Sequence, residues 1–276
     1  MAKTATKMQV NTWEAKMAES AVVAAKVEAN AVARPFFNTN GQLKFQGAVL
    51  AQGAPIIILD QIPANLYYAG SYDPNNPAPP DCYAIGRFDA EGNVVGVDTW
   101  DGRAELAPHK DCTSKVHTDC ATCPMNQFSS AKQGKGKACQ NTRRLAVIQA
   151  GTMQANGKFE AFTKPEQIDT SVLAYVKVPV TSVKTLSKVT ADTAKVLGRP
   201  MWSMFTLLRS VQNPSGGLPA FVQQYDTLAE IPNTLMDSVY KRYQEAVEDI
   251  TFAFAPATPR PEAPKGAKPK AARRYS

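Results

Sequence analysis

Histidine is scarce in this chain, which has only His109 and His117 among 276 residues. Both lie close to clustered cysteines, so a Ser-His-Asp triad is hard to assemble from the residues that are present. The zinc protease motif H-E-x-x-H is absent, and so is the deaminase pattern that combines H-x-E with P-C-x-x-C. These absences predict that the protein is not an enzyme.

Long apolar runs are also missing. No stretch approaches the roughly 20 apolar residues of a membrane span, and the N-terminus carries no apolar segment of a secretion signal. Cysteines that cluster at metal-ligand spacing suit a reducing compartment. The composition, 44% hydrophobic and 20% charged, is that of an ordinary globular chain. The sequence therefore predicts a cytoplasmic protein without membrane contact.

Four of the five cysteines and both histidines lie between residues 109 and 139. Cys120 and Cys123 form a C-x-x-C pair, whose spacing lets two thiolates turn toward one tetrahedral ion. Cys139 follows at a usual distance for the second part of a zinc site. Pro124 and the polar approach to the pair argue against a thioredoxin-like redox site, which opens a helix after a strand. The segment is too polar to fold by burying hydrocarbon, so we expect one structural zinc ion to order it.

The fourth zinc ligand stays open on spacing alone. His109, Cys112 and His117 all precede the C-x-x-C pair, and Cys82 lies outside this segment. Three cysteines and one further ligand would fill the coordination of the ion, which is typical of structural zinc. A disulfide and unligated thiols are the alternatives.

The net charge of +7 is concentrated in two segments. Residues 110–144 carry seven basic and two acidic residues, whereas residues 256–276 carry six basic residues and one acidic residue. Each segment therefore has a charge of +5, and the remainder of the chain has −3. Concentrated positive charge indicates a polyanionic partner such as nucleic acid, the alternative being a solvated surface.

The glycine- and lysine-rich stretch before Cys139 suits contacts with phosphates, because glycines let backbone amides approach and lysines add charge. It is not a Walker loop, since the G-x-x-x-x-G-K-[ST] spacing is absent. Aromatic side chains in the same loop-rich half can stack on the bases of a single strand. We expect nucleic acid to be bound by the cations Lys132, Lys135, Lys137, Arg143 and Arg144 and by the rings of Tyr72 and Phe128.

Short strands dominate the middle of the chain, and helices flank them. Apolar or alternating runs predict strands at residues 43–49, 56–59, 82–88, 144–148, 172–178, 201–208, 221–225 and 251–254. Helices are predicted at residues 12–33 and 182–197 and from Pro232 onward. We therefore expect an α+β fold with an antiparallel, barrel-like core of the oligonucleotide-binding type, into which the zinc loop is inserted.

Three regions follow from this pattern. Residues 1–35 form a helical N-terminal arm, and residues 36–255 form the zinc-containing domain that binds nucleic acid. Residues 256–276 are rich in Pro, Ala, Lys and Arg, and we expect this basic tail to be disordered.

Three stretches resemble a family of bacteriophage proteins that bind single-stranded DNA, many of which are known only as hypothetical proteins. They are the Tyr- and Pro-rich segment of residues 67–83, Ala107-Pro108-His109, and residues 120–145 with their C-x-x-C-P, G-K-G-K-A-C and R-R-L motifs. The similarity covers residues 36–211. A looser similarity links the chain to the phage T4-type single-stranded DNA-binding proteins, which have an oligonucleotide-binding fold and a zinc loop of one histidine and three cysteines. That resemblance implies the zinc ligands His109, Cys120, Cys123 and Cys139 and leaves Cys112 as a spare.

The resemblance implies a phage protein that coats or protects single-stranded DNA in replication or recombination, in the cytoplasm of the infected bacterial cell. Phage replication proteins would be further partners. Phage binders of the T4 type end in an acidic tail that recruits partners, whereas this tail is basic, so we expect it to touch DNA instead. The alternative function is a zinc-stabilised transcription or host-takeover factor that binds an RNA polymerase. A third is a nuclease that holds magnesium with Asp98 and Asp101, although a turn explains these two carboxylates equally well.

Overall fold

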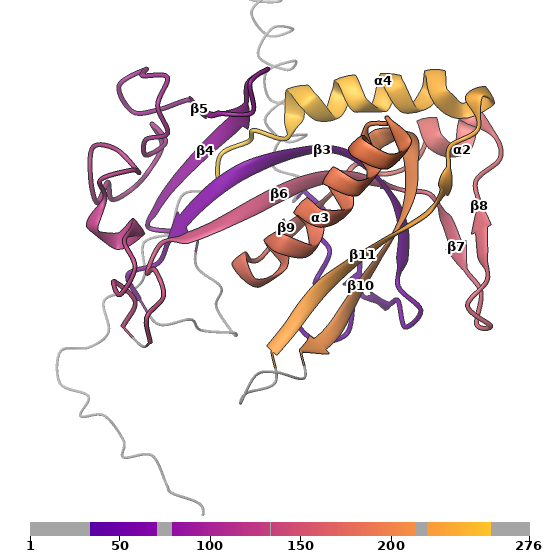
Figure 1. Cartoon of the computed structure of the whole chain (residues 1–276), viewed down its shortest axis with the longest axis horizontal. Coiled ribbons are helices and arrows are strands. Elements are labelled where there is room, and N and C mark those ends of the chain that lie inside the picture. The colour runs from indigo at the N-terminus through magenta and orange to yellow at the C-terminus, as the bar shows by residue number, and fades with distance from the viewer. Residues whose placement is uncertain (1–33, 71–78, 133, 214–219, 255–276) are drawn as a thin grey trace, which may run out of the picture. The chain divides into compact units, whose positions relative to one another are not determined.

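The computed structural model describes residues 34–70, 79–132, 134–213 and 220–254 (Figure 1). The predicted N-terminal helix, Tyr72 and the basic tail lie outside these described residues. The chain divides into two compact units between Pro35 and Phe36, and the second unit contains all the described strands and helices.

The core of this unit is a seven-stranded sheet built around one long strand, β3 (Ala54–Tyr67). One edge of β3 pairs with β6 (Gln140–Gln149), which pairs in turn with β9 (Ala174–Val178). Both pairings are antiparallel. Buried apolar residues fill most of β3 and β9 and residues 145–148 of β6, as expected for strands that are buried on both faces.

The other edge of β3 is shared by two strands. Its first part pairs with β10 (Met204–Asn213) and its last part with β4 (Cys82–Phe88). Beyond them lie β11 (Ala220–Glu230) and β5 (Val94–Val97). The sheet therefore forks at β3, and the described strands do not close into a barrel. The predicted α+β class with antiparallel pairing is confirmed, whereas the predicted barrel-like core is not, because β5 and β11 end on separate branches and the described strands leave the sheet open.

β3 accommodates a proline and a bulge where its partners change. Pro63 lies between the stretches that pair with β10 and β4, so its missing N–H breaks no ladder bond on that edge. The register against β6 shifts between Ile58 and Asp60. This bulge reverses the alternation of side chains, so that Ile57 and Ile62 both face the same core.

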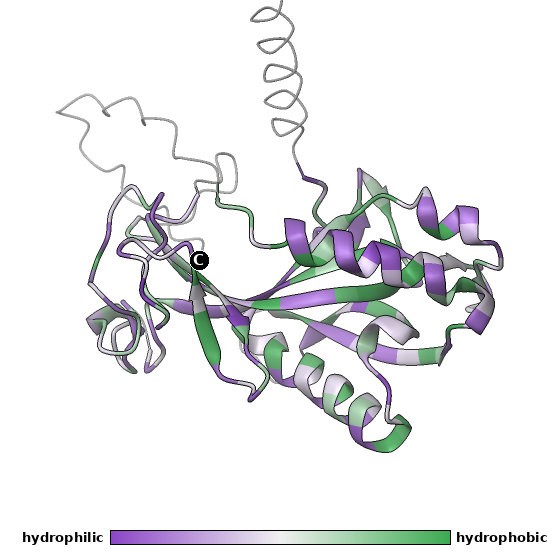
Figure 2. Cartoon of the chain, turned by 90° about the horizontal axis from the view of Figure 1, so that it is seen from above, coloured by the Kyte–Doolittle hydropathy of each residue, from purple (hydrophilic) through white to green (hydrophobic). Residues whose placement is uncertain are grey.

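A helix covers each face of the sheet. α4 (Asn233–Asp249) buries Leu235, Val239 and Ala246 on one face, and it turns a hydrophilic side outward (Figure 2). α3 (Val180–Leu197) buries Leu186 on the opposite face. The remaining elements are β1 (Lys44–Phe45), β2 (Ala48–Val49), β7 (Gly151–Met153), β8 (Phe159–Ala161), α2 (Pro165–Asp169) and the 3-10 turns η1 (Pro124–Asn126) and η2 (Met201–Ser203).

The predicted helices at 182–197 and after Pro232 are confirmed as α3 and α4. The predicted strand at 251–254 is wrong, because this segment runs irregularly and its rings Phe252 and Phe254 pack on the guanidinium of Arg144. No helix in the described part of the chain is long and apolar enough to cross a membrane.

Candidate metal and nucleic-acid site

The segment between β5 and β6, residues 98–139, is here called the cysteine loop. It folds back over β4 and β5, and two glycines make this approach possible. A Cβ on Gly96 would lie 2.6 Å from the carbonyl oxygen of Glu105, and one on Gly86 would lie 3.1 Å from Cδ1 of Leu106. A larger residue at Gly96 would press on the backbone of the loop, whereas one at Gly86 would first meet Val94 and Val95 of β5.

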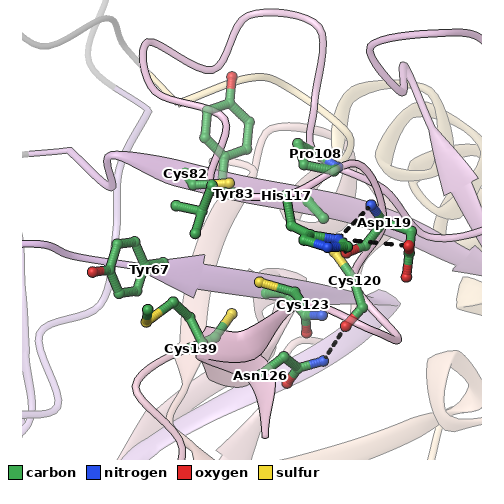
Figure 3. A pocket seen from close by; sticks show the side chains of 14 residues that line it. Tyr67, Cys82, Tyr83, Pro108, His117, Asp119, Cys120, Cys123, Asn126 and Cys139 are labelled. Carbon is green, nitrogen blue, oxygen red and sulfur yellow. Dashed lines mark hydrogen bonds and ion pairs between the residues drawn. The ribbon is translucent and has the colours of Figure 1, made fainter. Parts of the chain in front are cut away.

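The cysteine loop closes a small cavity against the ends of β3 and β4. Its volume is about 20 Å³, which is room for one water-sized sphere. Cys82, Cys120, Cys123, Cys139 and His117 all line it. Figure 3 shows the four cysteine side chains arranged around this one space. The structure therefore gathers the predicted cysteine ligands, and it adds Cys82 to them.

Local hydrogen bonds hold the cysteines in place. Cys82 opens β4 opposite Tyr67 of β3. Directly after Cys123 the chain makes the turn η1, where the side chain of Asn126 donates to the carbonyl of Cys120 at 2.6 Å. The N–H of Cys139 donates to the carbonyl of Met125 at 2.8 Å. The C-x-x-C pair and Cys139 are thus tied to one turn.

The pKa values of three thiols around the cavity are shifted by burial and by neighbouring cysteines. Burial raises the pKa of Cys120 and that of Cys139 to about 12, and neighbouring cysteines add to both shifts. The pKa of Cys82 is lowered to about 7, chiefly because it accepts a hydrogen bond from the Cys112 thiol. A bound cation would favour the thiolate form of each. Four sulfur donors around a space for one ion suit zinc, which prefers tetrahedral thiolate coordination.

All five cysteines are free thiols. Within the described ranges, no three His, Cys, Asp or Glu side chains converge closely enough to hold a metal ion as they stand. Metal binding would therefore require the thiols around the cavity to turn further inward. Cys112, the spare cysteine, accepts from the N–H of Tyr83 at 3.2 Å, and its sulfur lies 3.0 Å from the carbonyl oxygen of Tyr83. Its single S–H can donate either to that carbonyl or to Cys82. Cys112 therefore hydrogen-bonds to the backbone of β4 on the side that faces away from β3.

His109, the predicted fourth ligand, does not line the cavity. It is 1% exposed, its ring stacks on Tyr83 at 5.0 Å, and its Nδ1 accepts from the N–H of Asp111 at 3.1 Å. Its Nε2 makes no hydrogen bond to the described residues and lies 3.9 Å from Oδ2 of Asp98. Burial lowers the pKa of His109. The geometry therefore favours Cys82 over His109 as the fourth zinc ligand, because Cys82 lines the cavity together with the three predicted cysteines and His109 does not.

Phe128 and Lys135 are exposed on the cysteine loop, and Lys137 beside the ring is half-buried. The ring of Phe128 is 78% exposed, and Nζ of Lys137 lies 5.2 Å from its centre. Ser129, the next residue, has a φ of 68°, a left-handed conformation that costs free energy in a residue other than glycine. Lys135 is exposed, and its carbonyl accepts from the N–H of Ser129 at 3.1 Å. The ring and the lysines are therefore held on one ordered turn.

The other predicted cations differ in their accessibility. Lys132 is exposed but donates to the carbonyl of Ala69 at 3.0 Å, so it also ties the loop to the end of β3. Arg143 is half-buried, with its guanidinium 5.0 Å from the centre of the Phe88 ring. Arg144 is 3% exposed and donates to the carbonyls of Ile250 and Phe252. The prediction that Arg144 contacts DNA is therefore wrong, because its charge is enclosed in the core.

Two further cation–aromatic pairs were missed from the sequence. Nζ of Lys177 lies 5.4 Å from the centre of the Tyr68 ring, and the guanidinium of Arg103 lies 5.8 Å from that of Trp100. Lys177 comes from β9, far along the chain from Tyr68, so only the pairing of β9 with β6 could have brought them together in a prediction.

The two carboxylates of the nuclease alternative are already paired with cations. Oδ1 of Asp98 accepts from Lys110 at 2.8 Å, and the carboxylate of Asp101 accepts from the guanidinium of Arg103. These pairs hold the pKa of each carboxyl below its usual range. The arrangement is that of two surface ion pairs, and it gives no support to a magnesium site.

Comparisons with models of protein families, with curated protein sequences and with solved structures each find no match for this chain.

Proposed function

We propose that this protein binds single-stranded DNA through the turn of the cysteine loop that carries Phe128, Lys135 and Lys137. The observation that carries the proposal is an almost fully exposed phenylalanine ring beside a lysine ammonium, on a turn pinned by its own backbone hydrogen bonds. A ring of this kind stacks on a base, and the ammonium meets the adjoining phosphate.

Charge on the same segment supports a polyanion as the ligand. Residues 120–144 contain five basic residues and no acidic residue. With Arg144 enclosed in the core, four cations remain for the ligand, namely Lys132, Lys135, Lys137 and Arg143. An exposed aromatic ring would have no base to stack on in an intact duplex, because paired bases are stacked on one another. The combination therefore favours single strands over duplex.

One structural zinc ion, held by Cys82, Cys120, Cys123 and Cys139, would cross-link the loop to the end of β4. The metal supplies folding free energy to a segment with little apolar content, and no step of binding passes through it. The chain's own residues position the ring, with Asn126 and Ser130 fixing the turn that follows Cys123. Ser130 Oγ donates to the carbonyl of Met125 at 2.9 Å and accepts from the N–H of Ala138 at 2.9 Å.

The biological setting rests on the resemblance to phage proteins. It favours a non-enzymatic protein that coats or protects single-stranded DNA during phage replication or recombination inside the infected bacterium. An oligonucleotide-binding fold stays part of this proposal only as a prediction, since DNA binding through the turn does not require a closed barrel.

A titration of fluorescently labelled oligonucleotides tests the proposal. We expect the full-length protein to bind single strands of several sequences with similar affinity and to bind the matching duplexes more weakly. Anisotropy measured over a range of salt concentrations would report both affinity and the number of phosphate contacts. Equal or stronger binding to duplex would contradict the proposal. Failure to bind any DNA, together with tight binding to purified bacterial RNA polymerase, would favour the transcription-factor alternative.

A further inference from the structure

Three aromatic rings form a patch on the α4 side of the molecule, remote in sequence from the cysteine loop. Trp202 of η2 stacks on Tyr243 of α4 at 5.5 Å between ring centres, and Tyr243 stacks on Tyr240 at 5.9 Å. The third pair, Trp202 and Tyr240, is also separated by 5.9 Å. Tyr240 is 48% exposed, and the other two rings are half-buried. These three residues are here called the aromatic patch.

The aromatic patch has unused hydrogen-bonding capacity. The indole N–H of Trp202 and the hydroxyls of Tyr240 and Tyr243 make no hydrogen bond to the described residues. Asp237, one helical turn before Tyr240, is exposed and forms no ion pair within the described part of the chain. Flat rings with free donors beside a carboxylate match the way aromatic surfaces bind proline-rich segments, in which prolines pack on rings and backbone carbonyls accept hydrogen bonds.

The chain itself contains such a segment. Residues 256–264 read P-A-T-P-R-P-E-A-P, which holds two P-x-x-P motifs, Pro256–Pro259 and Pro261–Pro264, with Arg260 between them. P-x-x-P sequences favour the polyproline II conformation, which loses little conformational entropy on binding. The segment follows Phe254, the last described residue, at close range.

The length of chain after Phe254 decides which of the two motifs can reach the aromatic patch. The Phe254 ring lies 5.0 Å from Tyr83, which pairs with Leu66 of β3. β10 runs antiparallel to β3 with Thr206 opposite Ile56, so η2, which ends three residues before Thr206, lies level with Leu59. Seven strand residues between these positions span about 23 Å, which an extended chain crosses in about seven residues. Starting from Phe254, only the second motif reaches the aromatic patch.

We propose that the Pro261–Pro264 motif docks on the aromatic patch of the same chain. The remaining residues, 265–276, carry five basic residues and no acidic residue. Docking holds them beside α4, whose four acidic and two basic residues give that helix a charge of −2. Nucleic acid and α4 then compete for the basic end of the chain, so docking weakens binding of DNA by the tail until DNA displaces it. The docking itself does not depend on the proposed DNA binding.

Fluorine NMR of the full-length protein, labelled with fluorotryptophan, tests the docking without DNA. The chain has three tryptophans, and Trp202→Phe identifies the resonance of interest. We expect Pro261→Ala/Pro264→Ala to shift the Trp202 resonance and to leave that of Trp100 unchanged. The matched control, Pro256→Ala/Pro259→Ala, removes the motif that cannot reach and should leave Trp202 unchanged.

A second variant ties the shift to the patch. In a Tyr240→Ala background, the Pro261→Ala/Pro264→Ala pair should no longer move the Trp202 resonance. The proposal is overturned if the second proline pair has no effect in the wild-type chain, or if both proline pairs have the same effect. A shift that grows with protein concentration would also overturn it, because it would mean that the segment of a second copy occupies the patch.

Discussion

The ammonium of Lys137 lies 5.2 Å from the centre of the Phe128 ring, and the ring is 78% exposed. The lysine also donates to Oδ1 of Asn126 at 3.3 Å, the residue that holds the turn after Cys123. Ring and charge are therefore positioned by the same turn that positions the cysteines. The ring would stack on a DNA base and the ammonium would attract a phosphate, so their contributions to the affinity for single-stranded DNA can be measured separately.

Phe128→Ala should weaken binding to single-stranded DNA by about 1–3 kcal/mol, as expected for loss of one base–ring stack. The salt dependence should stay nearly unchanged, since no charge is removed. Stability should also be unchanged because the ring is mostly exposed, and thermal melting checks this. Phe221→Ala, which removes another exposed ring from β11, is the control and should bind like the wild type. Equal affinity of Phe128→Ala and wild type would remove the ring from the proposed site.

Lys135→Gln/Lys137→Gln should weaken binding to single-stranded DNA and make its affinity less dependent on salt. Each lost phosphate contact makes the slope of log affinity against log salt shallower by roughly 0.7, so the pair should change it by about 1.4. All single-stranded sequences should be weakened alike. Lys184→Gln/Lys195→Gln removes the same charge from exposed positions on α3 and serves as the control. If both double variants change the slope equally, the effect is one of overall charge, and the cysteine loop has no special part in binding.

Much of the sheet could be predicted from apolar runs, because buried antiparallel strands leave a clear pattern. The fork of the sheet could not be predicted, because it depends on β10 and β4 sharing one edge of β3, and these strands are far apart in the chain. The same limit explains Arg144. Its neighbour Arg143 is equally basic, and only the alternation of β6 against a covered face decides which of them is enclosed.

At the candidate metal site, Cys82 could not be predicted as a ligand for the same reason, because its position near the other cysteines depends on the pairing of strands. It stands at the start of a predicted strand, outside the cluster of residues 109–139, so spacing gave no reason to include it. The pairing of Cys82 with Tyr67 puts the start of β4 at the end of the sheet where the cysteine loop folds back. The resemblance to zinc loops of one histidine and three cysteines implies His109 instead, but its ring stacks on Tyr83.

Cys82→Ser should abolish binding of zinc by the full-length protein, as should Cys120→Ser and Cys139→Ser. Each change removes one thiolate from a four-sulfur site, so metal content should fall from one ion per chain toward none, with a lower Tm. His109→Gln and Cys112→Ser should both retain the ion. Metal analysis of protein purified without chelators provides the measurement. Retention of zinc by Cys82→Ser with loss in His109→Gln would restore the histidine as the ligand.

Arg144→Gln should destabilise the protein by about 3 kcal/mol, because it removes a buried guanidinium that donates to the carbonyls of Ile250 and Phe252. These hydrogen bonds hold the segment after α4 in place. The change should leave the salt slope of DNA binding as it is in the wild type. Urea unfolding gives the free energy of unfolding. Arg143→Gln, at the half-buried neighbouring position, should cost much less stability. A shallower salt slope with unchanged stability in Arg144→Gln would mean that this arginine reaches DNA after all.

The burial of His109 should make the protein sensitive to mild acid. Because burial lowers the folded-state pKa of His109 below its usual value, the unfolded chain takes up a proton at higher pH than the folded chain does. The stabilisation from the neutral imidazole is complete above the unfolded pKa of about 6.5 and is lost as pH falls through the folded pKa. The free energy of unfolding should therefore fall as the pH drops below about 7, and His109→Gln should reduce this fall. Metal-depleted protein should be used for all variants, because protonation of thiolates would otherwise release zinc over a similar range. If His109→Gln retains the full acid sensitivity, groups other than His109 cause it and the prediction is contradicted.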